Sequence, residues 1–232
     1  MKRSIFFGRT ARPLVDRPTM RRLDIVDNGL NNQVDIDASA ELGKGVQIRI
    51  FGRNNHLLIG ANTILGTGMI ELRNSESSIK IGEDCVLNGS FRCRAGQTHL
   101  RVGDKTTMMM AHISLHEAGK ITLGDNCMLS GDITMDVSDM HSILDVQSGE
   151  RLNPPRDIVI GDHVWLAHGV RIMKGAQIGQ DCIVGSRAMV FGEIPANSLA
   201  VGSPARVVRS GVTWDRRRIP KSNGAEIERA VI

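Results

Sequence analysis

The stretch from residue 160 to residue 195 divides without a break into six hexads: IGDHVW, LAHGVR, IMKGAQ, IGQDCI, VGSRAM and VFGEIP. The first position of each hexad is a branched aliphatic residue, and the fifth is apolar and usually small. The first positions are Ile160, Leu166, Ile172, Ile178, Val184 and Val190, and the fifth are Val164, Val170, Ala176, Cys182, Ala188 and Ile194. A period of six fits neither the about 3.6-residue turn of a helix nor a long alternating strand. It predicts a solenoid in which short strands alternate with tight turns.

An aliphatic residue followed by glycine recurs along most of the chain. The pairs are Leu42-Gly43, Ile59-Gly60, Ile81-Gly82, Val102-Gly103, Leu123-Gly124, Ile160-Gly161 and Ile178-Gly179. The last interval is 18 residues, or three hexads, which predicts a triangular coil. The earlier intervals are 17, 22, 21, 21 and 37 residues, so we expect insertions of a few residues at the corners. The alternative is an ordinary β-sandwich of short strands, which six unbroken hexads disfavour.

A thin stacked core needs few large side chains, and the composition agrees. Aromatic residues make up only 3% of the 232 residues and tyrosine is absent, although apolar residues together reach 41%. The four cysteines show no CxxC spacing, so neither a zinc site nor a redox motif is predicted and no metal is expected. Three of them fall at repeat positions that require small apolar side chains, which suits a reducing compartment.

The charged residues are unevenly distributed, and the net charge is +4. Basic residues crowd both ends of the chain: Lys2, Arg3, Arg9, Arg12, Arg17, Arg21 and Arg22, then Arg206, Arg209, Arg216, Arg217, Arg218 and Lys221. Such ends suit an anionic partner or are simply solvated, and the scarcity of aromatic residues argues against nucleic acid. No run reaches the about 20 apolar residues of a membrane span, and no apolar segment follows the charged N-terminus as in a signal peptide. We therefore expect a cytoplasmic protein without a membrane span.

From residue 35 to residue 209 the repeat resembles the hexapeptide-repeat acyltransferases, most strongly from Asp139 to Arg209. The resemblance implies an all-β fold, namely a left-handed parallel β-helix, and a homotrimer with active sites at its subunit interfaces. It divides the chain into an N-terminal basic segment (1–34), a β-helix acetyltransferase domain (35–209) and a C-terminal tail (210–232).

The hexads are interrupted by the polar stretch DVQSGERLNPPRD, which predicts a loop projecting from the solenoid over about residues 142–157. Rigid scaffolds commonly present functional residues on such loops. His141 stands beside the loop, and Trp165 follows 24 residues later. This arrangement resembles acetyltransferases that modify cell-surface polysaccharides, in which a histidine flanked by serine and aspartate precedes a Val-Trp hexad. The resemblance implies that His141 is the general base and that Trp165 shapes the acceptor pocket and assists at the reacting centre.

The chemistry explains why a histidine is needed. An alcohol attacks a thioester poorly, and a base that titrates near about pH 6.5 can take its proton as the new bond forms. Such general-base catalysis typically contributes about 10²–10⁴-fold in rate, and the oxyanion formed needs fixed hydrogen-bond donors. Asp139 could orient the imidazole of His141, contact the acceptor or cap a turn.

A second motif, EIPANSLAVGSPARVVR (193–209), follows the hexads. It resembles the closing segment of coenzyme A-dependent members of the family, in which a Gly-x-Pro-Ala turn leads to basic residues. The resemblance places Arg206 and Arg209 at the CoA phosphates, which suit charge-assisted arginine bonds. Further cofactor contacts are implied for Ala167, His168, Lys174, Gly185 and Ser186.

This chain departs from the family at Phe191-Gly192-Glu193, where many relatives have Thr-Lys-Asp. Arg187 is expected to replace the missing lysine. His168 also stands where relatives often have serine, glycine or asparagine.

The leading hypothesis is an acetyl-CoA-dependent O-acetyltransferase that acts on a sugar or cell-surface polysaccharide by direct transfer in a ternary complex. Serine, antibiotics and other small hydroxyl acceptors remain alternatives within the family. A γ-carbonic-anhydrase-like enzyme would need three zinc-binding histidines, for which His112, His116 and His141 are the candidates. A non-catalytic structural solenoid is the third possibility.

Overall fold

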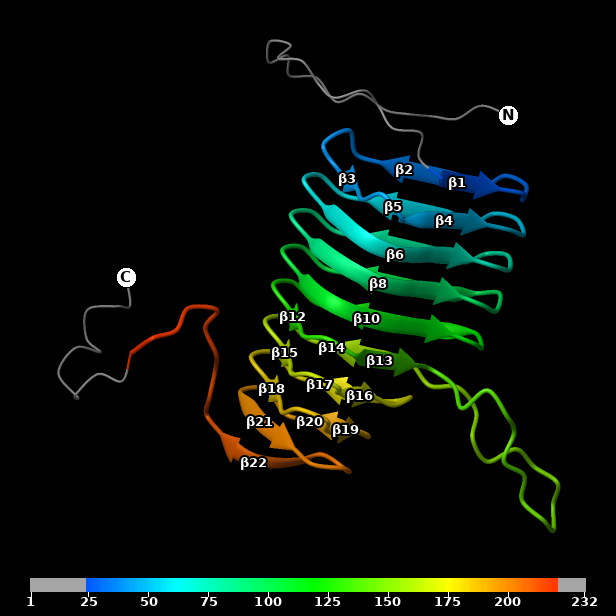
Figure 1. Ribbon diagram of the computed structural model, residues 1–232. Coiled ribbons are helices and arrows are strands. Elements are labelled where there is room, and N and C mark those ends of the chain that lie inside the picture. The colour runs from blue at the N-terminus through cyan, green and yellow to red at the C-terminus, as the bar shows by residue number, and fades with distance from the viewer. Residues whose placement is uncertain (1–23, 221–232) are drawn as a thin grey trace.

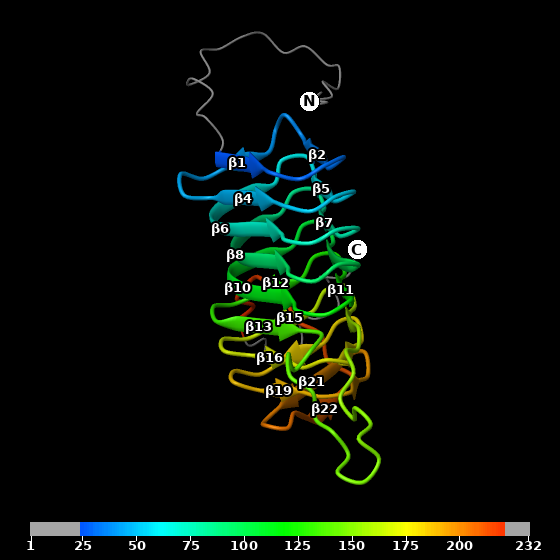
Figure 2. The ribbon, with the colours of Figure 1, turned by 90° about the vertical axis from the view of Figure 1, so that its right-hand side faces the viewer.

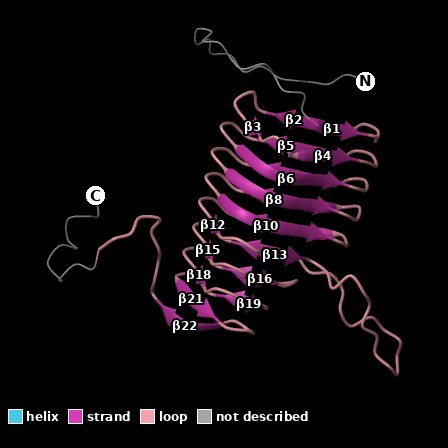
Figure 3. Cartoon of the chain, in the orientation of Figure 1, coloured by secondary structure: helices cyan, strands magenta, loops and turns pink. Residues whose placement is uncertain are grey.

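The computed structural model describes residues 24–220, so the basic residues before position 24 and Lys221 lie outside it. Strands, turns and loops make up the whole described part (Figure 3), which confirms the all-β prediction. Because residues 24–220 hold no helix, none in that range could cross a membrane.

The strands form two sheets. The 14-stranded sheet contains β1 (Asp24–Asp27), β3 (Glu41–Leu42), β4 (Gln47–Ile50), β6 (Ile64–Leu72), β8 (Val86–Cys93), β10 (Thr107–Leu115), β12 (Met128–Leu129), β13 (Ile133–Asp136), β15 (Trp165–Leu166), β16 (Arg171–Ile172), β18 (Ile183–Val184), β19 (Met189–Val190), β21 (Ser198–Val201) and β22 (Arg206–Ser210). The 8-stranded sheet contains β2 (Gln33–Ile36), β5 (His56–Ile59), β7 (Ser78–Ile81), β9 (Thr98–Val102), β11 (Gly119–Leu123), β14 (Ile158–Ile160), β17 (Gln177–Ile178) and β20 (Glu193–Ile194).

Each full coil crosses the larger sheet on two sides and the smaller sheet on the third, as β15, β16 and β17 do (Figures 1 and 2). Neighbouring coils pair in parallel, and only the last pair of strands, β21 and β22, is antiparallel within the described chain. The result is the parallel β-helix that the hexads predict.

Three edges separate the three sides. The middle edge, between the two sides of the larger sheet, contains turns 130–132, 167–170 and 185–188. The loop edge, where the chain passes to the smaller sheet, contains turns 73–77, 94–97, 116–118 and 173–176 and the segment 137–157. The strap edge, where the chain returns to the larger sheet, contains turns 103–106, 124–127, 161–164, 179–182 and 195–197.

The longer coils extend strands around the same edges. β6, β8 and β10 cross the middle edge as continuous strands, with a register shift in place of the turn. The first coil also begins earlier than the boundary expected at residue 35, because β1 pairs with β4 and Ile25 packs against the core. No aliphatic-glycine pair marks that coil, so the periodicity did not reveal it.

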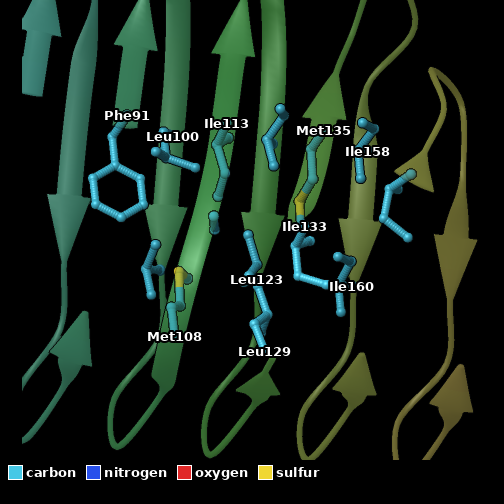
Figure 4. Packing of buried hydrophobic residues seen from close by; sticks show 14 of the residues in the cluster. Phe91, Leu100, Met108, Ile113, Leu123, Leu129, Ile133, Met135, Ile158 and Ile160 are labelled. Atoms are coloured by element: carbon cyan, nitrogen blue, oxygen red, sulfur yellow. The ribbon is translucent and has the colours of Figure 1, made fainter. Parts of the chain in front are cut away.

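The three sides enclose a prism, and the core is a stack of mostly aliphatic side chains inside it. Figure 4 shows these side chains projecting between facing strands. All first- and fifth-position residues of the six hexads are buried, as predicted. The recurrent glycine reflects close coil stacking, because a Cβ on Gly179 would lie 2.4 Å from the backbone nitrogen of Ala196. The four cysteines are free and buried, and burial raises the pKa of Cys93 to about 12 and that of Cys127 to about 11.

Leu123 tests this stacking, because it is fully buried and lies in register between Val102 and Ile160. We expect Leu123→Ala to lower the free energy of unfolding by about 2–5 kcal/mol, through lost burial and the cavity left behind. Urea denaturation measures the change. The matched control is Thr122→Ala on the outer face, for which about 0.5 kcal/mol or less is expected; equal losses in both variants would contradict the packing account.

Candidate active site

His141 lies in the segment 137–157, which leaves the loop edge between β13 and β14 and projects from the solenoid (Figures 1 and 2). The side chain is exposed. Its backbone is held on both sides, since its N–H donates to the Asp139 carbonyl at 2.8 Å and its carbonyl accepts from Asn153 Nδ2 at 2.8 Å. Asn153 is only 7% exposed, so a rigid amide fixes the backbone that carries the imidazole.

The Asp139 carboxylate braces the root of this loop. It accepts from Lys174 Nζ at 2.5 Å and from Asn153 Nδ2 at 2.8 Å. These two partners hold the pKa of Asp139 below its usual range, with Lys174 the larger cause. Within residues 24–220 the imidazole of His141 makes no hydrogen bond, so the predicted orientation of His141 by Asp139 is not seen in the single chain.

A second brace joins the loop to the neighbouring coil. Arg151 donates two bonds to the Glu117 carboxylate, at 2.6 and 2.7 Å, and the Ser138 hydroxyl donates a third. Beside it His116 pairs with Asp136 through Nδ1. Sequence reasoning missed the pairing of Glu117 with Arg151, because no motif marks partners that are 34 positions apart.

The Glu117 brace predicts a pH dependence. The hydrogen bonds from Arg151 and Ser138 lower the pKa of Glu117 to about 2. A carboxylate whose pKa is lower in the folded state stabilises the fold above its unfolded pKa, and that contribution is lost as the pH falls toward the folded value. We therefore expect wild type to have a higher melting temperature than Glu117→Gln at pH 7. This difference in melting temperature should close as the pH falls from about 4.5 to about 2.

Thermal scans across that pH range measure the gap. Glu150→Gln, in the exposed tip of the same loop, is the matched control. A gap that stays constant with pH would show that the Glu117 charge does not stabilise the loop.

An open cleft of about 350 Å³ lies at the root of the loop. Its lining residues are Asp139, Leu152, Asn153, Pro154, Arg156 and Lys174. Lys174, proposed from the sequence as a cofactor contact, also donates to the carbonyls of Asn153 and Pro154 at 2.9 and 3.3 Å. Its three donors are therefore occupied by the loop and Asp139, and a contact with CoA would require the loop to release it.

Trp165 begins β15, directly after the strap edge. Its half-buried side chain lies in register between Met128 and Ile183 on the adjoining coils. The indole nitrogen is buried and has no hydrogen-bond partner within the described chain. A buried donor without a partner costs free energy, which a hydrogen bond to this N–H would offset.

His141 and Trp165 lie at different edges of the prism. His141 follows β13 at the loop edge, whereas Trp165 adjoins the strap edge, where β15, β12 and β18 stack (Figure 1). The cleft at the loop root includes neither side chain. One chain alone therefore does not bring the two predicted catalytic residues together.

Most of the residues assigned to the cofactor gather at the middle edge. Ala167 and His168 lie in one turn, and Gly185, Ser186 and Arg187 lie in the turn of the next coil. The Arg187 N–H donates to the His168 carbonyl at 2.8 Å, which places the two turns in contact. Arg206 and Arg209 lie exposed on β22.

The three histidines named for a zinc site do not form one. Among residues 24–220 there is no group of three or more histidine, cysteine, aspartate or glutamate side chains that could hold a metal ion. His112 is exposed on β10, whereas His116 is already bonded to Asp136.

Comparison with known proteins agrees with this geometry. The family model described as bacterial transferase hexapeptide (six repeats) matches residues 157–192. A polysialic acid O-acetyltransferase of Neisseria meningitidis is 32% identical over 192 residues, which cover 82% of this chain and 89% of that protein. One from Escherichia coli O1:K1 / APEC is 27% identical over 138 residues, covering 60% of this chain and 45% of that protein.

Solved structures show the same fold. The polysialic acid O-acetyltransferase OatWY superposes with a TM-score of 0.79 at 30% identity, covering 87% of this chain and 96% of that one. The polySia-specific acetyltransferase NeuO gives a TM-score of 0.75 at 24% identity, covering 90% and 87%. The left-handed parallel β-helix that the family resemblance implied is thereby confirmed. The chain belongs to the hexapeptide-repeat acyltransferases, as an acetyltransferase whose co-substrate is acetyl-CoA.

Proposed function

We propose that this enzyme transfers the acetyl group of acetyl-CoA to a hydroxyl of an anionic cell-surface polysaccharide of the polysialic acid type. The similarity to a polysialic acid O-acetyltransferase over 82% of the chain carries the proposal. The cleft at the root of the loop that carries His141 supports it, because Arg156 lines that cleft and an anionic glycan needs a cation near the reacting hydroxyl.

In the proposed reaction the His141 imidazole accepts the proton of the acceptor hydroxyl while its oxygen attacks the thioester carbonyl. The carbonyl π electrons move to oxygen and form an oxyanion. Collapse of this intermediate breaks the carbon–sulfur bond, and the leaving thiolate takes the proton back from His141, which returns as neutral imidazole. No covalent acyl-enzyme forms, because acetyl passes directly from sulfur to oxygen in a ternary complex.

The unpartnered indole N–H of Trp165 is the donor that we assign to the oxyanion. Fixed donors are effective there because they need no reorganisation as charge develops. The two stacked turns of the middle edge would line the pantetheine arm through Ala167, His168, Gly185, Ser186 and Arg187, and Arg206 and Arg209 would face the CoA phosphates.

A homotrimer would complete the site. The separation of His141 and Trp165 on different edges supports this assembly, because a neighbouring copy can present its strap edge to the loop edge of the first. Cyclic symmetry would then repeat the composite site at every interface.

An acceptor panel tests the proposed substrate. Release of the CoA thiol from acetyl-CoA is followed with polysialic acid, a neutral glycan, maltose and serine as acceptors. We expect polysialic acid to raise the rate well above the acceptor-free background. Comparable rates with the small acceptors would overturn the polysaccharide assignment, and no stimulation by any acceptor would overturn the transferase proposal.

A further inference from the structure

After β22 the chain turns at Gly211 and runs back along the strap edge, opposite to the direction in which the coils advance (Figure 1). We call residues 212–216 the strap. Its hydrogen bonds meet the coils in reverse order. The Val212 N–H donates to the Asn197 carbonyl at 3.0 Å, and the Thr213 hydroxyl donates to Asp181 Oδ1 at 2.9 Å. Trp214 Nε1 then donates to the His163 carbonyl at 2.8 Å, and Arg216 Nη2 donates to the Cys127 carbonyl at 3.1 Å.

The strap edge is built to receive such a segment. Lys105, Asn126, His163, Asp181 and Asn197 occupy the same position in successive turns, and all have φ between 52° and 58°. Coils repeat about every 4.8 Å and an extended chain advances about 3.3 Å per residue. An extended segment therefore meets a new turn every one or two residues, which matches the contacts of the strap.

Trp214 is the buried centre of the strap, with only 8% of its surface exposed. Its ring stacks on His163, with centroids 4.2 Å apart and planes 11° apart. His163 is itself held by Asp181, through Nδ1 to Oδ1 at 2.8 Å. The guanidinium of Arg216 lies 5.5 Å from the centre of the Trp214 ring.

Trp214 also packs against Trp165, at 6.1 Å between ring centroids and a tilt of 51°. This is a favourable aromatic geometry. The neighbours of Trp165 in register on the adjoining coils are Met128 and Ile183. The ring of Trp214 adds an aromatic contact that restricts the tilt of the indole. The Trp165 N–H has no partner within residues 24–220 that could fix its direction.

We infer that Trp214 is a positioning residue for acetyl transfer: from the strap it fixes the indole of Trp165 in the orientation that the reaction requires. The inference rests on the proposed function, in which the Trp165 N–H meets the oxyanion. Arg216 contributes by anchoring the strap to Thr107 Oγ1 at 2.8 Å and to the Cys127 carbonyl at 3.1 Å.

Kinetics of Trp214→Ala and Trp214→Phe test the inference. Because a misplacement of about 1 Å can cost up to about 10²-fold in rate, we expect Trp214→Ala to lower kcat about tenfold or more while KM for acetyl-CoA changes less than about threefold. Phenylalanine keeps a ring on His163 and should stay within about threefold of wild-type kcat. Arg217→Ala is the matched control, since among residues 24–220 the Arg217 side chain pairs only with Asp215 on the strap itself, and it should leave kcat unchanged.

Fluorescence gives a readout that does not depend on activity. The chain has two tryptophans, so Trp165 is the sole emitter in both Trp214 variants. We expect acrylamide to quench Trp165 more strongly, and its anisotropy to be lower, in Trp214→Ala than in Trp214→Phe. If Trp214→Ala does not fold, Arg216→Ala with both tryptophans intact should show the same loss of kcat.

The two proposals fail in different ways. A wild-type enzyme without transferase activity overturns the proposed function, whereas the fluorescence comparison still tests the strap. Wild-type kcat in Trp214→Ala, or equal quenching of Trp165 in the alanine and phenylalanine variants, overturns the positioning role.

Discussion

Replacing His141 by alanine is expected to lower kcat at least about 10²-fold while leaving the affinity for acetyl-CoA within about threefold of wild type. The imidazole is exposed on a loop whose backbone is held by Asn153, so its removal should take away the proposed base without disturbing the core. Most of the residues proposed for the cofactor lie at the middle edge or on β22, which is why donor binding should survive. Initial rates with saturating acceptor and equilibrium titration with acetyl-CoA measure the two quantities.

His112→Ala is the matched control for this prediction. His112 is also exposed but lies on the flat side of β10, with no contact to the loop brace, and its replacement should leave kcat unchanged. Equal losses in the two variants, or wild-type activity in His141→Ala, would remove His141 as the base.

Mixing subunits that carry His141→Ala with subunits that carry Trp165→Ala is expected to restore activity that neither variant has alone. The two residues lie at different edges of one chain, so each complete site would combine His141 of one copy with Trp165 of the next. With random mixing in a cyclic assembly, about a quarter of the interfaces combine an intact His141 with an intact Trp165. The recovered rate should therefore approach about a quarter of wild type in the unfractionated mixture, and about a third in isolated mixed trimers, in which one of the three interfaces is complete.

Co-expression with two affinity tags allows mixed assemblies to be isolated and assayed beside each pure variant. Mixing after purification, without subunit exchange, is the control and should show no recovery. Mixed assemblies no more active than the better variant would show that both residues act within one chain.

The repeat made the interior of this protein predictable. First-position residues such as Ile172 and fifth-position residues such as Ala176 repeat once per side, so periodicity alone assigns them to the core. The loop was predictable for the opposite reason, since its polar, proline-containing stretch cannot continue the pattern. Both predictions depend only on local sequence, because each hexad forms one strand and turn of the solenoid.

The braces and the strap depend on contacts between distant segments. Asp139 meets Lys174, and Arg216 meets Thr107 from 109 positions away. Such pairings depend on which coils lie side by side and on the path of the terminal segment. The positions of these partners do not recur at a fixed interval in the sequence. Arg216 looked like one of several solvated arginines, and the signal that could have distinguished it was the neighbouring Trp214 in a chain with so few aromatic residues.

The proposed active site combines both kinds of information. The Ser-Asp-Met-His-Ser context directed attention to His141, whereas its braced backbone and its separation from Trp165 emerged only in three dimensions. The residues proposed for the cofactor show the same division. The stacked turns at the middle edge follow from the repeat, whereas the hydrogen bonds between Lys174 and the loop do not.

The fate of the acetyl group tests the central claim most directly. Enzyme is incubated with acetyl-CoA labelled in the acetyl group and with polysialic acid, and the label is then sought on the polymer, on the protein and in free acetate. Direct transfer to a hydroxyl predicts label on the polymer as an alkali-labile ester, with none held by the protein. Label retained on the protein before acceptor is added, or released only as acetate, would contradict it.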